Sequence, residues 1–155
     1  MENIISQAHK RLLKNKQTIA IAESCTGGLL SSFLTKLPGS SSYFILGVVT
    51  YSNKAKQNIL RIPATIIRKN GAVSKTISIL MSQKVKQLAK ANLSIAITGI
   101  AGPSGATSNK PVGTVFISIT KGNKTLCKKF LFKGNRNAIR KKAALKAIAL
   151  LNKLS

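Results

Sequence analysis

Three side chains of this sequence could perform nucleophilic chemistry together: Ser24, Tyr51 and Lys56. A serine hydroxyl needs a base to remove its proton, and a lysine can be that base when burial or nearby cations lower its pKa. A tyrosine beside them could relay the proton, so the set needs neither His nor Asp. The spacing alone does not separate Lys56 from the solvated lysines of an ordinary helix face.

Ser24 lies in the segment ESCTGG at residues 23–28, where two glycines precede an expected helix. Glycines let the backbone approach a ligand closely, and the free N–H groups at a helix start favour an anion. The alternative is a turn that needs glycine for packing alone. Because Ser24 and Glu23, the one carboxylate outside the N-terminus, stand beside these glycines, we favour a functional turn. Cys25 has no nearby base, which favours a small buried thiol over a second nucleophile.

A second glycine-rich segment, residues 98–113, follows another apolar run. It lacks the GxxxxGK[ST] pattern of a P-loop and the GxGxxG pattern of a dinucleotide site. Its length and glycine content exceed what a simple connection needs. Two interpretations remain open from the residues alone, a loop that holds a phosphate or ribose with Lys110 as the countercharge, and a flexible surface loop.

The elements that would position these residues alternate along the chain. The length of 155 residues predicts one domain, residues 1–155. Apolar runs predict strands at 18–22, 43–50, 93–98, 112–119 and 125–132, and helical spacing predicts helices at 4–15, 29–37, 54–60, from 74 onward and 136–154. This order predicts an α/β fold, a single three-layer α/β/α domain whose mostly parallel sheet becomes mixed through the 112–132 hairpin. Ligands bind beyond the carboxyl ends of such strands. Three polar segments fall there, ESCTGG (23–28), TYSNKAK (50–56) and the glycine-rich segment 98–113.

Charge and composition narrow the function classes. The chain has 26 Lys and Arg against 2 Asp and Glu, a net charge of +24. Because these lysines are dispersed and aromatic residues make up only 5% of the chain, we expect any nucleic-acid binding to be weak and non-specific. One His and two Cys argue against a metal site, and no apolar run is long enough for a membrane span. We therefore expect a cytoplasmic protein without metal.

Six motifs together resemble one known family. They are AESCTGGLL (22–30), PGSSSYF (38–44), GVVTYSNKAK (47–56), GAVS (71–74), TGIAGPSG (98–105) and KPVGTVFI (110–117). In this order they resemble the CinA C-terminal domain family, also called PncC, over about residues 5–150. The resemblance implies an amidohydrolase that deamidates nicotinamide mononucleotide to nicotinate mononucleotide and ammonia, in pyridine nucleotide recycling, without a cofactor.

The resemblance also assigns roles to residues. It implies Ser24, Tyr51 and Lys56 as the catalytic set and Ser41 as a serine that contacts the substrate. The residues that we expect around the substrate are Glu23, Cys25, Thr26, Gly27, Gly28, Ser41, Thr98, Gly99, Ile100, Ala101, Gly102 and Lys110. Ser24 could attack the carboxamide itself or hold a water molecule that does.

The partners follow from the same interpretation. They are a small nucleotide substrate and, where the protein self-associates, further copies of the chain in a homo-oligomer. The alternative function is a catalytically inactive nucleotide-binding or nucleic-acid-associated competence-type protein.

Overall fold

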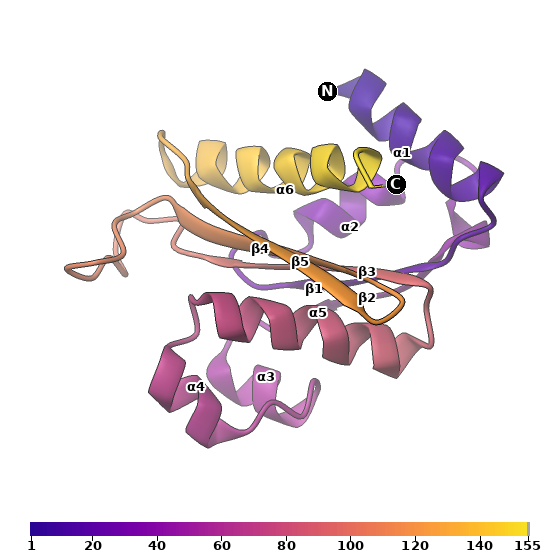
Figure 1. Cartoon of the computed structure of the whole chain (residues 1–155). Coiled ribbons are helices and arrows are strands. Elements are labelled where there is room, and N and C mark those ends of the chain that lie inside the picture. Colours follow the sequence, from indigo (N-terminus) through magenta and orange to yellow (C-terminus); the bar gives the residue numbers. More distant parts are fainter. Residues whose placement is uncertain (155) are drawn as a thin grey trace.

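The computed structural model describes residues 1–154, which form three layers (Figure 1). A central sheet has α1, α2 and α6 on one face and α5, with α3 and α4 outside it, on the other. The elements in chain order are α1 (Glu2–Lys14), β1 (Ile19–Glu23), α2 (Leu29–Leu34), the 3-10 turn η1 (Ser40–Ser42), β2 (Phe44–Val49), α3 (Asn53–Asn58), α4 (Ala64–Asn70), α5 (Lys75–Ala89), β3 (Leu93–Gly99), β4 (Thr114–Lys121), β5 (Lys124–Leu131) and α6 (Arg136–Asn152).

The sheet has five strands in the order β2-β1-β3-β4-β5. β1 pairs in parallel with both β2 and β3, whereas β4 is antiparallel to β3 and to β5. Four strands therefore run in one direction and β4 runs in the other. This confirms the predicted α/β fold with a mixed sheet, and it places the carboxyl ends of β2, β1 and β3 side by side.

The two apolar cores follow from the alternation of side chains along the central strands. On β1, Ile19 and Ile21 pack toward α1, α2 and α6, whereas Ala20 and Ala22 pack toward α5. Because β1 is buried on both faces, it reads as a continuous apolar run in the sequence. Its last residue is Glu23, so the strand delivers a buried carboxylate and then Ser24 to the edge of the sheet.

One helix was not predicted from the sequence. α4 contains the β-branched residues Thr65, Ile66 and Ile67, which have low intrinsic helix propensity. It begins directly after Pro63 and ends at Gly71, which has a φ of 79°. Proline at a helix start and glycine past its end are the signals that could have located this helix.

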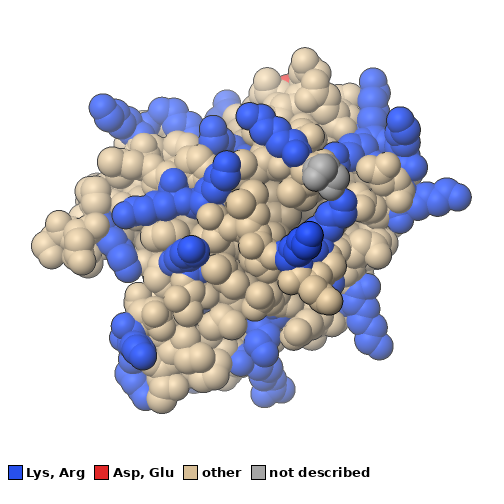
Figure 2. Space-filling view, viewed as in Figure 1, with Lys and Arg blue, Asp and Glu red and all other residues tan. Residues whose placement is uncertain are grey.

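The basic side chains are spread over the visible face of the molecule without gathering into one stripe (Figure 2). Glu2 forms an ion pair with Lys36 at 3.1 Å, on the surface. Within residues 1–154, no helix combines the length and the apolar character that crossing a membrane would require.

Candidate active site

The three polar segments meet where three adjacent strands end. Ser24 follows β1, and its N–H donates to the carbonyl of Ile97 on β3 at 2.9 Å. Thr50 follows β2, and its N–H donates to the carbonyl of Glu23 at 2.9 Å. The parallel ladder thus extends past both strand ends and fixes Ser24 between the segments 50–51 and 97–101. This is the crevice at the carboxyl ends of the strands that the sequence predicted.

Lys56 reaches Ser24 directly. Ser52 caps α3 by accepting a hydrogen bond from Ala55 N–H at 3.0 Å, which starts the helix that carries Lys56. Lys56 Nζ lies 3.2 Å from Ser24 Oγ, 2.8 Å from the Thr50 carbonyl oxygen and 3.2 Å from the Tyr51 carbonyl oxygen. The side chain of Lys56 is 1% exposed. Such burial distinguishes this lysine from the solvated lysines that cover the surface.

Burial also sets the protonation of the two titratable groups beside Ser24. It lowers the pKa of Lys56 from 10.5 to about 8, since removal from water opposes the charged form. It raises the pKa of the Cys25 thiol to about 11, so this thiol is neutral at pH 7. Cys25 therefore fits the expectation of a small buried thiol, and Lys56 becomes half neutral near pH 8.

Tyr51 has two separate roles in the structure. Its backbone carbonyl oxygen lies 3.5 Å from Ser24 Oγ, whose hydroxyl can donate to it, and it also accepts from Lys56. Its phenol hydroxyl accepts a hydrogen bond from Arg136 Nη2 at 2.9 Å and is on the exposed side of the cavity. Lys56 contacts Ser24 directly, whereas the hydrogen-bond partner of the Tyr51 hydroxyl within residues 1–154 is Arg136. The proton relay through Tyr51 stays a prediction.

Glu23 is fully buried, and its carboxylate serves the start of α2. It accepts hydrogen bonds from the N–H of Leu30 at 2.8 Å, the N–H of Ser31 at 3.0 Å and the hydroxyl of Ser31 at 2.7 Å. The residue at the N-cap position is Gly28, which has no side chain to cap the helix. Glu23 supplies that cap from β1, and its negative charge also favours the positive end of the helix dipole. These contacts orient the backbone of the turn, and Glu23 is not among the residues that line the cavity at Ser24.

The turn at residues 24–28 is held from the opposite side by Arg140 of α6. Its guanidinium donates to the carbonyl oxygens of Cys25 at 3.2 Å and Thr26 at 3.0 Å. Gly27 has a φ of 57°, and a Cβ there would come within 3.2 Å of Arg140 Nη2. Among the described residues, the backbone N–H of Cys25 donates to no carbonyl oxygen, and Cys25 lines the cavity at Ser24. This N–H is therefore the group of the turn that a ligand beside Ser24 can contact.

Ser24 and Lys56 open into a cavity of about 300 Å³. Nine of the residues predicted for the site line it: Ser24, Cys25, Tyr51, Lys56, Thr98, Gly99, Ile100, Ala101 and Gly102. Thr98 supports the wall on the α5 side, because its hydroxyl donates to the Ala72 carbonyl at 2.8 Å. Five further residues complete the lining, Ala72, Val73, Ser104, Gly105 and Arg136. The sequence analysis missed Arg136, because it is one of 26 basic residues and no motif in its segment distinguishes it from the others.

Other predicted residues lie outside this lining. Thr26, Gly27 and Gly28 form the turn behind Ser24. Lys110 Nζ donates to the Val73 carbonyl at 2.5 Å and ties the glycine-rich loop to the segment before α5, so the structure does not present it as a phosphate countercharge. Ser41 lies in η1, before β2 begins, at the end of the sheet opposite Ser24. Within this chain Ser41 is therefore not part of the site, because it precedes a strand whose far end forms the crevice.

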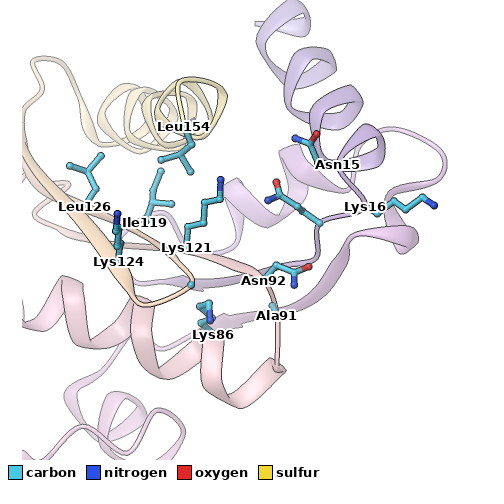
Figure 3. Close-up of a pocket in the computed structure, with 12 residues that line it drawn as sticks. Asn15, Lys16, Lys86, Ala91, Asn92, Ile119, Lys121, Lys124, Leu126 and Leu154 are labelled. Atoms are coloured by element: carbon cyan, nitrogen blue, oxygen red, sulfur yellow. The ribbon is translucent and has the colours of Figure 1, made fainter.

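A larger hollow of about 730 Å³ lies away from Ser24 (Figure 3). It is bordered by the α1–β1 connection, the α5–β3 connection and the β4–β5 hairpin, and Lys86, Lys121 and Lys124 line it beside Ile119 and Leu126. It shares no lining residue with the cavity at Ser24 in the described part of the chain. Residues 1–154 contain no group of three or more His, Cys, Asp or Glu side chains that could hold a metal ion.

Comparison with known sequences identifies a protein family and relatives that match this chain. A family model described as the CinA C-terminal domain matches residues 1–155. A CinA-like protein of Thermotoga neapolitana is 49% identical over 144 residues, which cover 92% of this chain and 35% of that protein. One of Geobacter sulfurreducens is 40% identical over 153 residues, which cover 98% of this chain and 37% of that protein. The chain thus spans about a third of the length of these curated relatives.

Solved structures agree with this relationship over nearly the whole chain. A competence damage-inducible protein A (ComA) of Klebsiella pneumoniae superposes with a TM-score of 0.95 at 32% identity, and the match covers 98% of this chain and 94% of that chain. A competence-damaged protein (CinA) superfamily protein of Escherichia coli superposes with a TM-score of 0.94 at 32% identity, over 99% of this chain and 90% of that chain.

Proposed function

The chain belongs to the CinA C-terminal domain family, and from this membership and the contact between Ser24 and Lys56 we propose that it is an amidohydrolase. Its substrate is nicotinamide mononucleotide, and its products are nicotinate mononucleotide and ammonia. The observation that carries the proposal is a buried lysine nitrogen 3.2 Å from a serine hydroxyl, in a cavity at the carboxyl ends of the strands.

The contacts of Lys56 fit a general base. A neutral lysine amine has two N–H donors and one lone pair. The carbonyl oxygens of Thr50 and Tyr51 can accept the two N–H groups, which turns the lone pair toward Ser24 Oγ. A base is most effective when its pKa is close to the working pH, and the pKa of about 8 meets that condition.

The reaction then proceeds in two halves. Ser24 Oγ attacks the carboxamide carbon while Lys56 takes the hydroxyl proton, and the N–H of Cys25 stabilises the negative oxygen that forms. The C–N bond breaks, Lys56 returns its proton to the leaving nitrogen, and ammonia departs. Water deprotonated by Lys56 attacks the Ser24 ester, and the C–O bond to Ser24 breaks as Lys56 returns this proton to Ser24 Oγ. The acid product loses its proton to solvent and leaves as the carboxylate.

A direct attack by water is the other way to use the same residues. In that route Ser24 holds the water by a hydrogen bond and Lys56 deprotonates it. Hydroxylamine distinguishes the two routes, because an ester on Ser24 would be trapped as a hydroxamate during turnover. We expect hydroxamate formation to accompany ammonia release.

The test of the proposed function is ammonia release from nicotinamide mononucleotide by the purified protein without added metal. The wild type should turn over, whereas Ser24→Ala and Lys56→Met should lose at least a thousandfold in kcat, since each removes a reacting group. Lys54→Met is the matched control, because Lys54 is an exposed residue of the same helix. Full activity in Ser24→Ala, or no turnover by a folded wild type, would refute the proposal.

A further inference from the structure

The cavity at Ser24 has two cationic side chains in its described lining, Lys56 and Arg136. Lys56 has no N–H group left for a ligand, because its three contacts use every N–H of a lysine ammonium. Lys110, the countercharge expected from the sequence, donates to the Val73 carbonyl instead. An anionic group on a ligand in this cavity therefore has Arg136 as its available cation.

Arg136 keeps most of its hydrogen-bonding capacity free for such a group. A guanidinium has five N–H donors, and the structure occupies one on Nη1, to the Gly102 carbonyl at 2.7 Å, and one on Nη2, to the Tyr51 hydroxyl at 2.9 Å. The side chain is exposed at the rim of the cavity. These two contacts hold the guanidinium in place, and its remaining donors match the geometry of phosphate oxygens.

The electrostatics of this rim favour an anion. Arg136 is the first residue of the 17-residue helix α6, and the first turn contains no acidic residue. A cation at this end adds to the positive end of the helix dipole instead of opposing it. The two Glu side chains of the sequence are engaged elsewhere, Glu23 at the start of α2 and Glu2 with Lys36. No Asp or Glu side chain therefore neutralises Arg136.

Tyr51 connects the reacting end of the cavity to this cation. Its backbone carbonyl oxygen contacts Lys56 and Ser24, whereas its phenol hydroxyl contacts Arg136. The length of one tyrosine side chain thus separates the nucleophile from the guanidinium. In a carboxamide mononucleotide the amide and the phosphate also stand at opposite ends, with the ring and the ribose between them.

We infer that Arg136 binds the phosphate of the substrate and makes the site specific for carboxamide nucleotides over the corresponding nucleosides. This inference rests on the proposed function for the identity of the reacting group. It assigns the recognition of the phosphate to the start of α6, which is more than a hundred residues after Ser24 in the sequence.

The experiment compares nicotinamide mononucleotide with nicotinamide riboside, which lacks only the phosphate. Arg136→Gln should raise KM for the mononucleotide about tenfold to a hundredfold, the range expected for loss of hydrogen bonds to a charged group. For the same variant, kcat for the mononucleotide and kcat/KM for the riboside should stay within about threefold of the wild type. Such a change is smaller than the expected rise in KM. Arg136→Lys should recover part of the affinity, because it keeps the charge but lacks the planar fork.

Lys141→Gln is the matched control, since it removes one positive charge from an exposed position of the same helix. It should leave both substrates unchanged, which separates a contact with phosphate from the general field of a +24 chain. An equal loss on both substrates in Arg136→Gln would show that Arg136 only holds Tyr51 and Gly102 in place. That result, or an unchanged KM for the mononucleotide, would overturn the inference.

A binding measurement separates this inference from the proposed reaction. In a Ser24→Ala background, ribose 5-phosphate should bind more tightly than ribose in calorimetry, and Arg136→Gln should remove the difference. If the wild type released no ammonia but this difference appeared, the reaction would be refuted and the phosphate site retained. If ribose 5-phosphate bound no better than ribose, or equally well to Arg136→Gln, the phosphate site would be refuted.

Discussion

Replacing Lys56 with Met should change how the stability of the fold depends on pH, because burial opposes the charged form of this side chain. Burial lowers the pKa of Lys56 from 10.5 to about 8 in the folded protein. In the unfolded chain the same side chain lies in water and titrates near 10.5. Between these pH values the unfolded chain binds a proton that the folded chain does not bind. The wild type is therefore penalised fully below pH 8, and it gains stability as the pH rises toward 10.5.

The size of the effect follows from the two pKa values. A tenfold change in proton affinity corresponds to about 1.4 kcal/mol. The lowered pKa of Lys56 therefore destabilises the wild-type fold by about 3 kcal/mol at pH 7 and by about 1 kcal/mol at pH 10. Methionine has no charge to desolvate, and its loss of contacts to the Thr50 and Tyr51 carbonyls is common to both pH values. The free energy of unfolding of Lys56→Met relative to the wild type should fall by about 2 kcal/mol between pH 7 and pH 10.

Urea unfolding followed by circular dichroism at pH 7 and pH 10 measures this difference. Lys54→Met is the control, because Lys54 is exposed on α3 and its removal should produce no comparable change with pH. If the difference between Lys56→Met and the wild type were the same at both pH values, burial would not be lowering the pKa of Lys56. The assignment of this lysine as a base near neutral pH would then lose its physical basis.

Three further predictions follow from the site. The kcat/KM for nicotinamide mononucleotide should rise about tenfold from pH 7 to pH 9 and then level off, as Lys56 with a pKa of about 8 becomes neutral; a flat profile in stopped ammonia assays would contradict this. Tyr51→Phe should lower kcat less than about tenfold, below the loss typical of an acid–base residue, because its hydroxyl contacts Arg136 and not the pair Ser24–Lys56; a loss as large as that of Lys56→Met would support the tyrosine relay. Glu23→Gln should lower the free energy of unfolding by about 2 kcal/mol in urea titrations, because it removes the charge from three buried hydrogen bonds at the start of α2; an unchanged midpoint would contradict its role as a cap.

The strands and the position of the site could be predicted because their signals are local. β1 and β3 are buried on both faces, so their sequences are mainly apolar and lead into polar segments. Parallel neighbours then bring Ser24, Tyr51 and Thr98 to one edge without further information. In contrast, α4 was missed because its β-branched residues give no helical propensity, and packing against α5 stabilises it.

The roles of several site residues could not be predicted because they depend on contacts between distant segments. The resemblance to a family named Tyr51, but only the structure separates its carbonyl, near Lys56, from its hydroxyl, near Arg136. Glu23 was singled out as the one interior carboxylate, yet its partners at Leu30 and Ser31 depend on how α2 turns back after Gly28. Likewise, when basic residues are so frequent, the sequence alone does not show which of them lines a cavity.

The contacts of Arg140 with the turn at residues 24–28 have a consequence for how the protein is made. The carbonyl oxygens of Cys25 and Thr26 are bound by a residue of the final helix. During synthesis the chain emerges from its N-terminus, so Ser24 leaves the ribosome long before residues 136–140 exist. The earlier strands can pair during that interval, but the guanidinium of Arg140 can bind the turn only after α6 has been translated. The turn at residues 24–28 therefore gains these contacts more than a hundred residues after its own synthesis.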